Sequence, residues 1–264
     1  MWRPLKNAAL PFTPFAHSQL QLLLAAQVAI GIGFWLGAGQ GVMPSPAALG
    51  QAWMGLVRQQ GLLYELWASV KVLLLALLIA SVLSLALATA ATAPLFDALA
   101  RFASSLRFLG FAGLSYVFML MAGDAGQLKL ALLVFGISVM MVTAMLAAVR
   151  AIPAQAVEHC KSLGMRHWRI SYELVVLGKA DVFLDLVRQN AAVGWTLLAM
   201  VEGLTRSQGG IGALLLNQNR YFQLSGVFAI QLTILLYGLG QDYLLGKLRT
   251  TLCPYASIDE RNAP

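Results

Sequence analysis

The chain has 264 residues, of which 59% are hydrophobic and only 11% carry a charge, and its mean hydropathy is +0.74. These proportions leave too few polar side chains to cover a water-soluble globule, so they exclude an ordinary soluble protein and favour a membrane protein. The formal net charge of +7 is explained by lysines and arginines that gather on one side of a membrane, and we expect no binding to nucleic acid.

Six apolar stretches follow one another along the chain, each close to the length of about 20 residues that crosses a bilayer. They cover residues 17–37, 66–90, 96–122, 128–149, 180–204 and 224–246. None shows the alternation typical of strands, which predicts an all-α membrane protein of six transmembrane helices in a single domain, residues 1–264. Lysine and arginine are more frequent on the side that holds both termini, so we expect both termini in the cytoplasm.

Two stretches depart from plain spans. Residues 49–64 combine aromatic side chains with Arg58, which suits either a short helix on the outer face, in the headgroup zone, or an ordinary helix packed on the bundle. The third span carries charges in its first half and glycines in its second, which predicts a break between Arg107 and Gly110.

A charged amphipathic segment, residues 151–178, lies between spans four and five on the cytoplasmic side. A helix that begins at Pro153 would place one apolar stripe along it. That stripe would consist of Pro153, Ala156, Val157, Cys160, Leu163 and Gly164. Gly164 would end the helix in a left-handed conformation, and a second helix would begin near His167. Periodicity alone fits a helix that docks into a partner's groove, but it favours a surface helix that lies on the membrane or packs on neighbouring loops.

Ionisable residues inside span five point to a functional face. Asp181, Asp185 and Arg188 share one side of the predicted helix, with Trp195 two turns beyond. A charge near the bilayer centre is costly, so these side chains should face protein or a wet cavity. Arg188 is the best candidate to contact an anionic solute, and its alternative role is an internal ion pair with Asp185. Glu202 would act in gating, pair with Arg206 or lie in water.

The sequence shows none of the common catalytic motifs. It has no phosphate-binding loop, no His-Glu-x-x-His and no Gly-x-Ser-x-Gly. His159, Cys160 and His167 lack the spacing of a closed zinc site, so we expect no metal. The chain is therefore predicted to be no enzyme and to bind no cofactor of its own.

Several motifs stand in the order found in a known family. Glu158 and Gly164 are spaced as in the glutamate-to-glycine signature of ABC importer permeases, with His159 and Cys160 in place of Ala-Ala and Leu177 in place of the closing proline. Further similarities are carried by Met43-Pro44-Ser45-Pro46, Arg188, Trp195, Glu202 and Gly210-Ile211-Gly212. Together they resemble the subfamily that imports nitrate, taurine, other sulfonates and bicarbonate.

The resemblance implies a type I permease bundle in a bacterial inner membrane that imports a small solute, anionic in that subfamily. It implies two ABC ATPase subunits that hold ATP and Mg, a second permease subunit, identical or related, an external solute-binding protein and surrounding membrane lipid. The ATPases would be contacted by Val157, Glu158, Cys160, Lys161, Leu163, Gly164 and Arg166. The solute pathway would include Arg188, Trp195 and Glu202.

Two other classes of protein fit the same sequence. An ion-coupled secondary carrier would use Asp181, Asp185 and Arg188 on span five for coupling, without any ATPase. A membrane-embedded enzyme or assembly factor fits less well, because catalytic residues do not cluster. Neither the solute nor the identity of the second permease subunit follows from the sequence.

Overall fold

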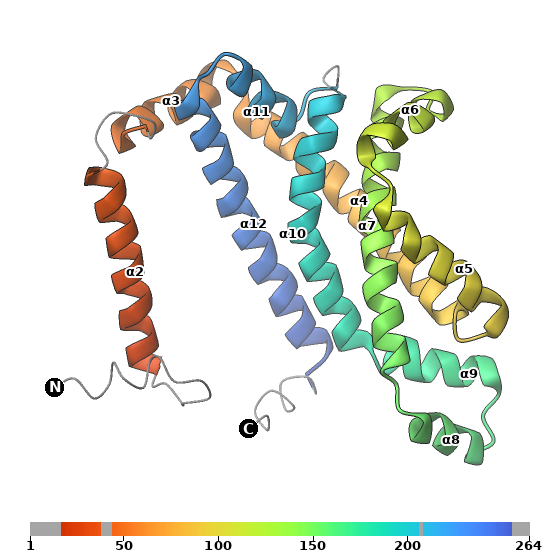
Figure 1. Cartoon of the computed structure of the whole chain (residues 1–264). Helices are drawn as coiled ribbons and strands as arrows, with labels where there is room; N and C mark the ends of the chain where they lie inside the picture. Colours follow the sequence, from red (N-terminus) through yellow and green to blue (C-terminus); the bar gives the residue numbers. More distant parts are fainter. Residues whose placement is uncertain (1–16, 38–43, 206–207, 255–264) are drawn as a thin grey trace. The chain divides into compact units, whose positions relative to one another are not determined.

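The structure is a computed structural model that describes residues 17–37, 44–205 and 208–254. All regular secondary structure in these ranges is helical, as the absence of strand-like alternation in the apolar stretches predicts. The chain divides into two compact units, residues 1–51 and 52–264, which are coloured by sequence in Figure 1.

The first unit contains helix α2 (His17–Gly37) and the start of α3 (Pro46–Gln59). Helix α2 has the bounds predicted for the first span, and its apolar side chains are exposed, Leu22 and Ile30 by 72% each. The indole nitrogen of Trp35 donates a hydrogen bond to the Pro44 carbonyl at 3.1 Å, which holds the chain where it leaves the helix.

The second unit holds helices at the place of every remaining predicted span (Figure 1). They are α4 (Leu62–Ala90), α5 (Pro94–Ser105), η1 (Leu106–Phe108), α6 (Phe111–Met121), α7 (Ala125–Arg150), α8 (Ala154–Ser162), α9 (His167–Ser171), η2 (Tyr172–Leu177), α10 (Ala180–Leu204), α11 (Ile211–Arg220) and α12 (Leu224–Leu252). The segment predicted as an outer helix, residues 49–64, is divided between α3 and the start of α4.

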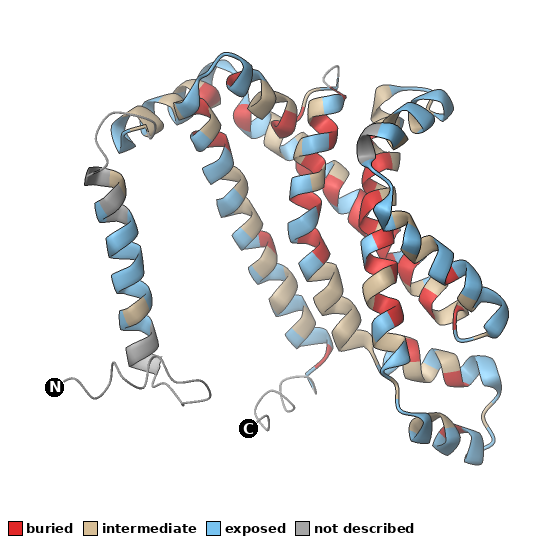
Figure 2. Ribbon diagram, in the orientation of Figure 1, coloured by how far each residue is buried: buried red, intermediate tan, exposed pale blue. Residues whose placement is uncertain are grey.

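The core of this unit lies where α4, α7 and α10 pack together. Leu73, Leu132 and Leu198, one from each helix, are fully buried, and Figure 2 shows the buried residues concentrated along these three helices. Helices α4 and α10 approach closely at Gly194, where a Cβ atom would lie 2.7 Å from the Leu73 side chain. The small residue therefore permits the contact that brings the fifth predicted span against the second.

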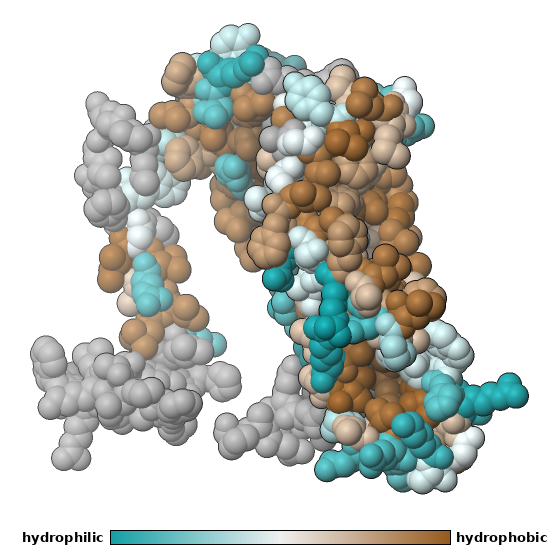
Figure 3. Space-filling model, turned by 45° about the vertical axis from the view of Figure 1, so that its right-hand side comes forward, coloured by the Kyte–Doolittle hydropathy of each residue, from teal (hydrophilic) through white to brown (hydrophobic). Residues whose placement is uncertain are grey.

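Three helices of the described residues, α4, α7 and α12, are long and apolar enough to cross a membrane. A fourth crossing is possible if α5 to α6, bent by 117°, counts as one broken span. Large apolar side chains are exposed on these helices, for example Leu78 at 63% and Leu236 at 62%. Figure 3 shows such hydrophobic residues covering much of one face. An apolar surface of this extent is compatible with contact to lipid.

The structure refines two of the predicted spans. The break expected between Arg107 and Gly110 is present, because η1 and two extended residues separate α5 from α6. Helix α10 has the bounds predicted for the fifth span, but it is not among the long apolar helices, since Asp181, Asp185 and Arg188 occupy its first half.

Helix α11 packs across the end of α10 at Gly212, where a Cβ atom would lie 2.5 Å from the Ala199 carbonyl oxygen. We predict that Gly212→Ala forces the two backbones apart and destabilises the fold by about 1–3 kcal/mol. Thermal unfolding in detergent measures this loss, with Gly55→Ala as the control because nothing lies within 4 Å of its Cβ position. Equal midpoints for the two variants would contradict the close packing.

Candidate functional site

The segment predicted to contact ATPases forms a short capped helix, α8, that follows the end of α7 (Figure 1). Pro153 stands at its N-cap, and Gly164 ends it with φ of 74°, as the sequence predicts. The Gly164 amide donates to the Lys161 carbonyl at 2.9 Å, and the Met165 amide donates to the Cys160 carbonyl at 3.3 Å. This pair of bonds is a Schellman motif, which fixes where the helix ends and how the chain leaves it.

The two faces of α8 differ as predicted in the middle of the helix but not at its ends. Cys160 is buried and Val157 is half-buried, whereas Glu158 and Lys161 are exposed. The predicted apolar stripe also included Pro153, Leu163 and Gly164, which are exposed, Leu163 by 61%. They stand outside the regular turns of the helix, with Pro153 at the N-cap, Leu163 at the C-cap and Gly164 beyond it.

The turn after α8 leads into an equally exposed stretch. Arg166 and Arg169 are exposed, and Trp168 is exposed by 61%. Together with Leu163 and Glu158 they are the exposed apolar and charged side chains of α8, the turn after it and α9, and this set is called here the α8–α9 surface. A mixture of large apolar side chains and arginines is typical of surfaces that bind another protein.

A cavity of about 310 Å³ lies where α8 and α9 meet the end of α7. Its lining includes Val157 and Lys161 of α8, His167 of α9 and Val149 of α7. A hydrogen bond of 2.7 Å between the hydroxyls of Thr92 and Ser171 joins this region to the end of α4. The segment then continues through the π-helical turn η2, where the Gly178 amide donates to the Glu173 carbonyl at 2.8 Å, and into α10.

Arg188 and Trp195, both predicted for a solute pathway, line one cavity of about 290 Å³ between α10 and α12. The Arg188 guanidinium donates to Asp242 at 2.7 Å and lies 3.8 Å from Asp185. Asp242, on α12, is therefore a closer partner than the Asp185 expected from the sequence. The Trp195 indole donates to Gln241 at 2.9 Å.

Glu202 occupies a different place, fully buried near the other end of α10. It pairs with Lys129 of α7, whose side chain is 5% exposed. Its Oε1 accepts from the Ser69 hydroxyl at 2.6 Å, and its Oε2 accepts from the Gly212 amide at 2.8 Å. The sequence suggested gating, a bond to Arg206 or contact with water. Arg206 lies outside the described residues, and the water contact is ruled out by the burial.

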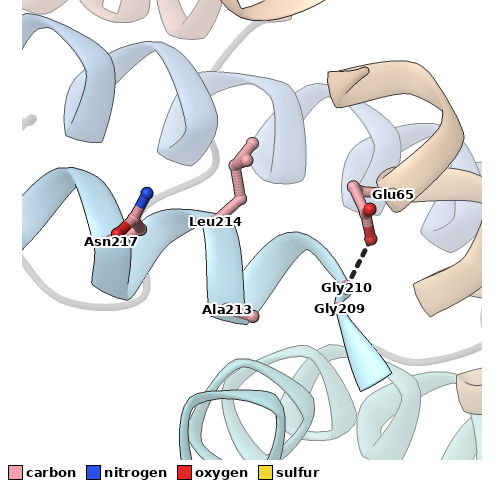
Figure 4. Close-up of a pocket in the computed structure, with 6 residues that line it drawn as sticks. All are labelled: Glu65, Gly209, Gly210, Ala213, Leu214 and Asn217. Atoms are coloured by element: carbon pink, nitrogen blue, oxygen red, sulfur yellow. Dashed lines mark hydrogen bonds between the residues drawn. The ribbon is translucent and has the colours of Figure 1, made fainter. Parts of the chain in front are cut away.

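The glycine segment before α11 is bound to the same region. The Ile211 amide donates to Ser69 at 2.9 Å, and the Gly210 amide donates to Glu65. Figure 4 shows this bond at the edge of a cavity of about 260 Å³ that is also lined by Asn217. Gly210 has φ of 105°, and a Cβ atom there would lie 2.3 Å from the Glu202 carboxyl, so only glycine fits.

The structure thus assembles the predicted residues into three separate places. Val157, Glu158, Cys160, Lys161, Leu163, Gly164 and Arg166 lie together on α8 and its following turn. Arg188 and Trp195 share a cavity, while Glu202 lies roughly 21 Å from Arg188 along the helix, from a rise of about 1.5 Å per residue. Asp242 and Lys129 were not predicted, although a charge within an apolar span is itself a signal of a functional partner.

No model of a known protein family matches the chain, and no curated protein matches it.

The buried Lys129–Glu202 pair gives a stability prediction. Lys129→Met leaves the Glu202 carboxylate buried without its counter-charge, which should destabilise the fold by about 3–5 kcal/mol. Adding Glu202→Gln should restore part of this loss, because the uncompensated charge is removed as well. Unfolding midpoints in detergent of the two single variants and the double variant measure the coupling.

The control for this double-mutant cycle is Arg101→Met. The Arg101 side chain is 68% exposed, and it pairs with Asp97 one turn away on the same helix. Little change is expected there, because exposed pairs contribute little. If the effects of Lys129→Met and Glu202→Gln simply added, the two groups would not act as a pair.

Proposed function

We propose that the chain is the transmembrane permease subunit of an ATP-driven ABC importer of type I. The observation that supports this best is the geometry of α8. It is a short helix with a fixed end, packed on one side through Val157 and Cys160, and it presents Glu158 outward. A short exposed helix of this kind suits binding by a soluble partner, whose movement would then displace the helices joined to α8.

The segments on either side of α8 would transmit its movement to the cavity between α10 and α12. Three residues separate it from α7, and α9 with η2 joins it to α10, which holds Arg188 and Trp195. Two ATPase subunits, with ATP and Mg bound to them, would move α8 as a rigid body. The movement would alternate the access of the α10–α12 cavity between the two sides of the membrane.

The proposal assigns six membrane crossings to α2, α4, the pair α5 and α6, α7, α10 and α12. It places the protein in a bacterial inner membrane with both termini in the cytoplasm. A second permease subunit would complete the pathway, and an external binding protein would deliver a small solute. The resemblance of the motifs implies an anion for that solute.

A photo-crosslink tests the partner directly. We expect p-benzoylphenylalanine at position 158 on α8 to form an adduct with a nucleotide-binding subunit in native membranes, identified by mass spectrometry. The same group in place of Leu236, which is 62% exposed on α12, should give no such adduct. Capture of only lipid, or of no nucleotide-binding protein, at position 158 would contradict the proposal.

Gly164→Val tests whether α8 acts as a lever. Its φ of 74° disfavours any β-branched side chain, so the helix end and the exit of the chain should change. We expect the variant to insert into the membrane and to keep basal ATP hydrolysis while losing uptake. Normal uptake together with normal stimulation of ATP hydrolysis would show that α8 carries no coupling.

A second function is favoured by one observation, the charged cluster that α10 and α12 form together. Arg188 contacts Asp242 and Asp185, and Arg249 lies 3.9 Å from Asp185. Clusters of this kind inside membrane helices couple ions to transport in secondary carriers. Collapse of the ion gradient with an ionophore would stop such a carrier at once, whereas an ATP-driven importer would continue in the short term.

A further inference from the structure

The cavity where α8 and α9 meet the end of α7 has an aliphatic inner wall and a basic mouth. Its volume of about 310 Å³ is that of a small ligand pocket. On the inner wall, Val175 is buried while Val149 and Ile152 are half-buried, and all three belong to an apolar core shared with α4. Lys161 of α8 and His167 of α9 also line the cavity, and both are exposed. One space thus presents an apolar surface together with two basic side chains.

The cavity lies at the depth where a membrane would meet water. Helices α4 and α7 are two of those long and apolar enough to cross a membrane, and they end at Ala90 and Arg150 (Figure 1). Thr92 and Val149, which stand next to these ends, line the cavity. Lipid headgroups occupy the zone just beyond the hydrocarbon that such helices span. The mouth of the cavity is therefore within reach of the phosphates of the surrounding lipid.

The two basic side chains of the mouth have no counter-charge. Lys161 and His167 form no ion pair within the part of the chain that the structure describes, and no carboxylate from that part lines the cavity. Glu173 is paired with Arg169 at 3.8 Å, and Glu158 of α8 does not line the cavity. The Lys161 ammonium can only donate hydrogen bonds, and a histidine ring donates one even when it is neutral. The mouth therefore suits an anionic group rich in acceptor oxygens.

Few ligands satisfy both parts of the cavity. Water would leave the aliphatic inner wall hydrated, which is unfavourable. An acyl chain alone would take the Lys161 ammonium out of water without a partner. A phospholipid covers the apolar wall and places its phosphate at the mouth, as in other basic pockets at the ends of membrane helices. A zwitterionic headgroup would also bring a cation, for which the described lining offers no carboxylate.

We propose that this cavity binds the headgroup of an anionic phospholipid, with the phosphate at Lys161 and His167. The bound lipid would contact α7, α8 and α9 at once, so it would hold α8 against the bundle. The site goes beyond the proposed transport function and does not require an ATPase. It also assigns Lys161 to the membrane, whereas the motif resemblance assigns this residue to contact with an ATPase.

Lipid retention tests the site on the full chain. The protein is placed in nanodiscs that contain equal amounts of phosphatidylglycerol and phosphatidylcholine with the same acyl chains. It is then transferred to mild detergent, and the lipid that stays bound is identified by native mass spectrometry. We expect phosphatidylglycerol to exceed phosphatidylcholine by about fivefold, the effect of one basic side chain beside an anionic lipid. The double variant Lys161→Gln, His167→Gln should bring this ratio to about one.

Two further variants separate the cavity from general attraction by the positive chain. His159→Gln with Lys247→Gln removes the same two residue types at exposed positions outside the cavity lining, and it should keep the lipid preference. Val157→Phe narrows the cavity and leaves both basic side chains in place, so it should lose the bound phosphatidylglycerol. The unfolding midpoint in detergent checks that Val157→Phe remains folded.

Several results would overturn the proposal. They are equal retention of the two lipids by the parent chain, unchanged retention of phosphatidylglycerol in Lys161→Gln, His167→Gln or in folded Val157→Phe, and an equal loss in the control variant. Displacement of the lipid by an excess of inorganic phosphate would instead assign the cavity to a free anion. None of these results bears on the crosslink at position 158, so the lipid site and the importer can each fail without the other.

Discussion

The second unit depends on one buried ion pair, between Lys129 and Glu202. A buried ion pair fixes the angle and register of the helices that it joins, because any other arrangement leaves an unpaired charge in a low-dielectric interior. Here the pair joins α7 to α10, Ser69 adds α4, and the amides of Ile211 and Gly212 add α11. Four helices are thus held at one end by a single hydrogen-bonded group.

The opposite end of α10 is organised differently. Its charges are partly exposed and lie on the side that faces α12, and the region beyond α7 carries the mixed α8–α9 surface. One end of the helix is therefore rigid and closed, while the other is polar and accessible. An element with this asymmetry can pivot about its buried end, which is what the proposed alternation of access would require of α10.

The sequence was sufficient to place the helices, the break near Arg107 and the left-handed end of α8 at Gly164, because each leaves a local signal of composition, glycine or proline. It was not sufficient to pair charges between helices. Along α4, α7 and α12 the apolar side chains are not gathered on one face, so no stripe shows which face meets which neighbour. Hence Asp242 and Lys129 were missed, and Asp185 was favoured as the partner of Arg188 because it lies on the same helix. Leu163 was misplaced for a related reason, since periodicity does not register that the helix ends one residue earlier.

The π-helical turn η2 sets the rotation of the next helix, α10, relative to α9. Its wide turn, closed by the bond from Gly178 to Glu173, inserts one residue more per turn than an α-helix would, between the α8–α9 surface and α10. Adding or deleting one residue in this turn would rotate α10 by about 100° relative to α9. Arg188 would then leave the cavity and Glu202 would leave Lys129. The length of this linker is accordingly under stronger constraint than its side chains, and change in this region is expected by substitution and not by insertion or deletion.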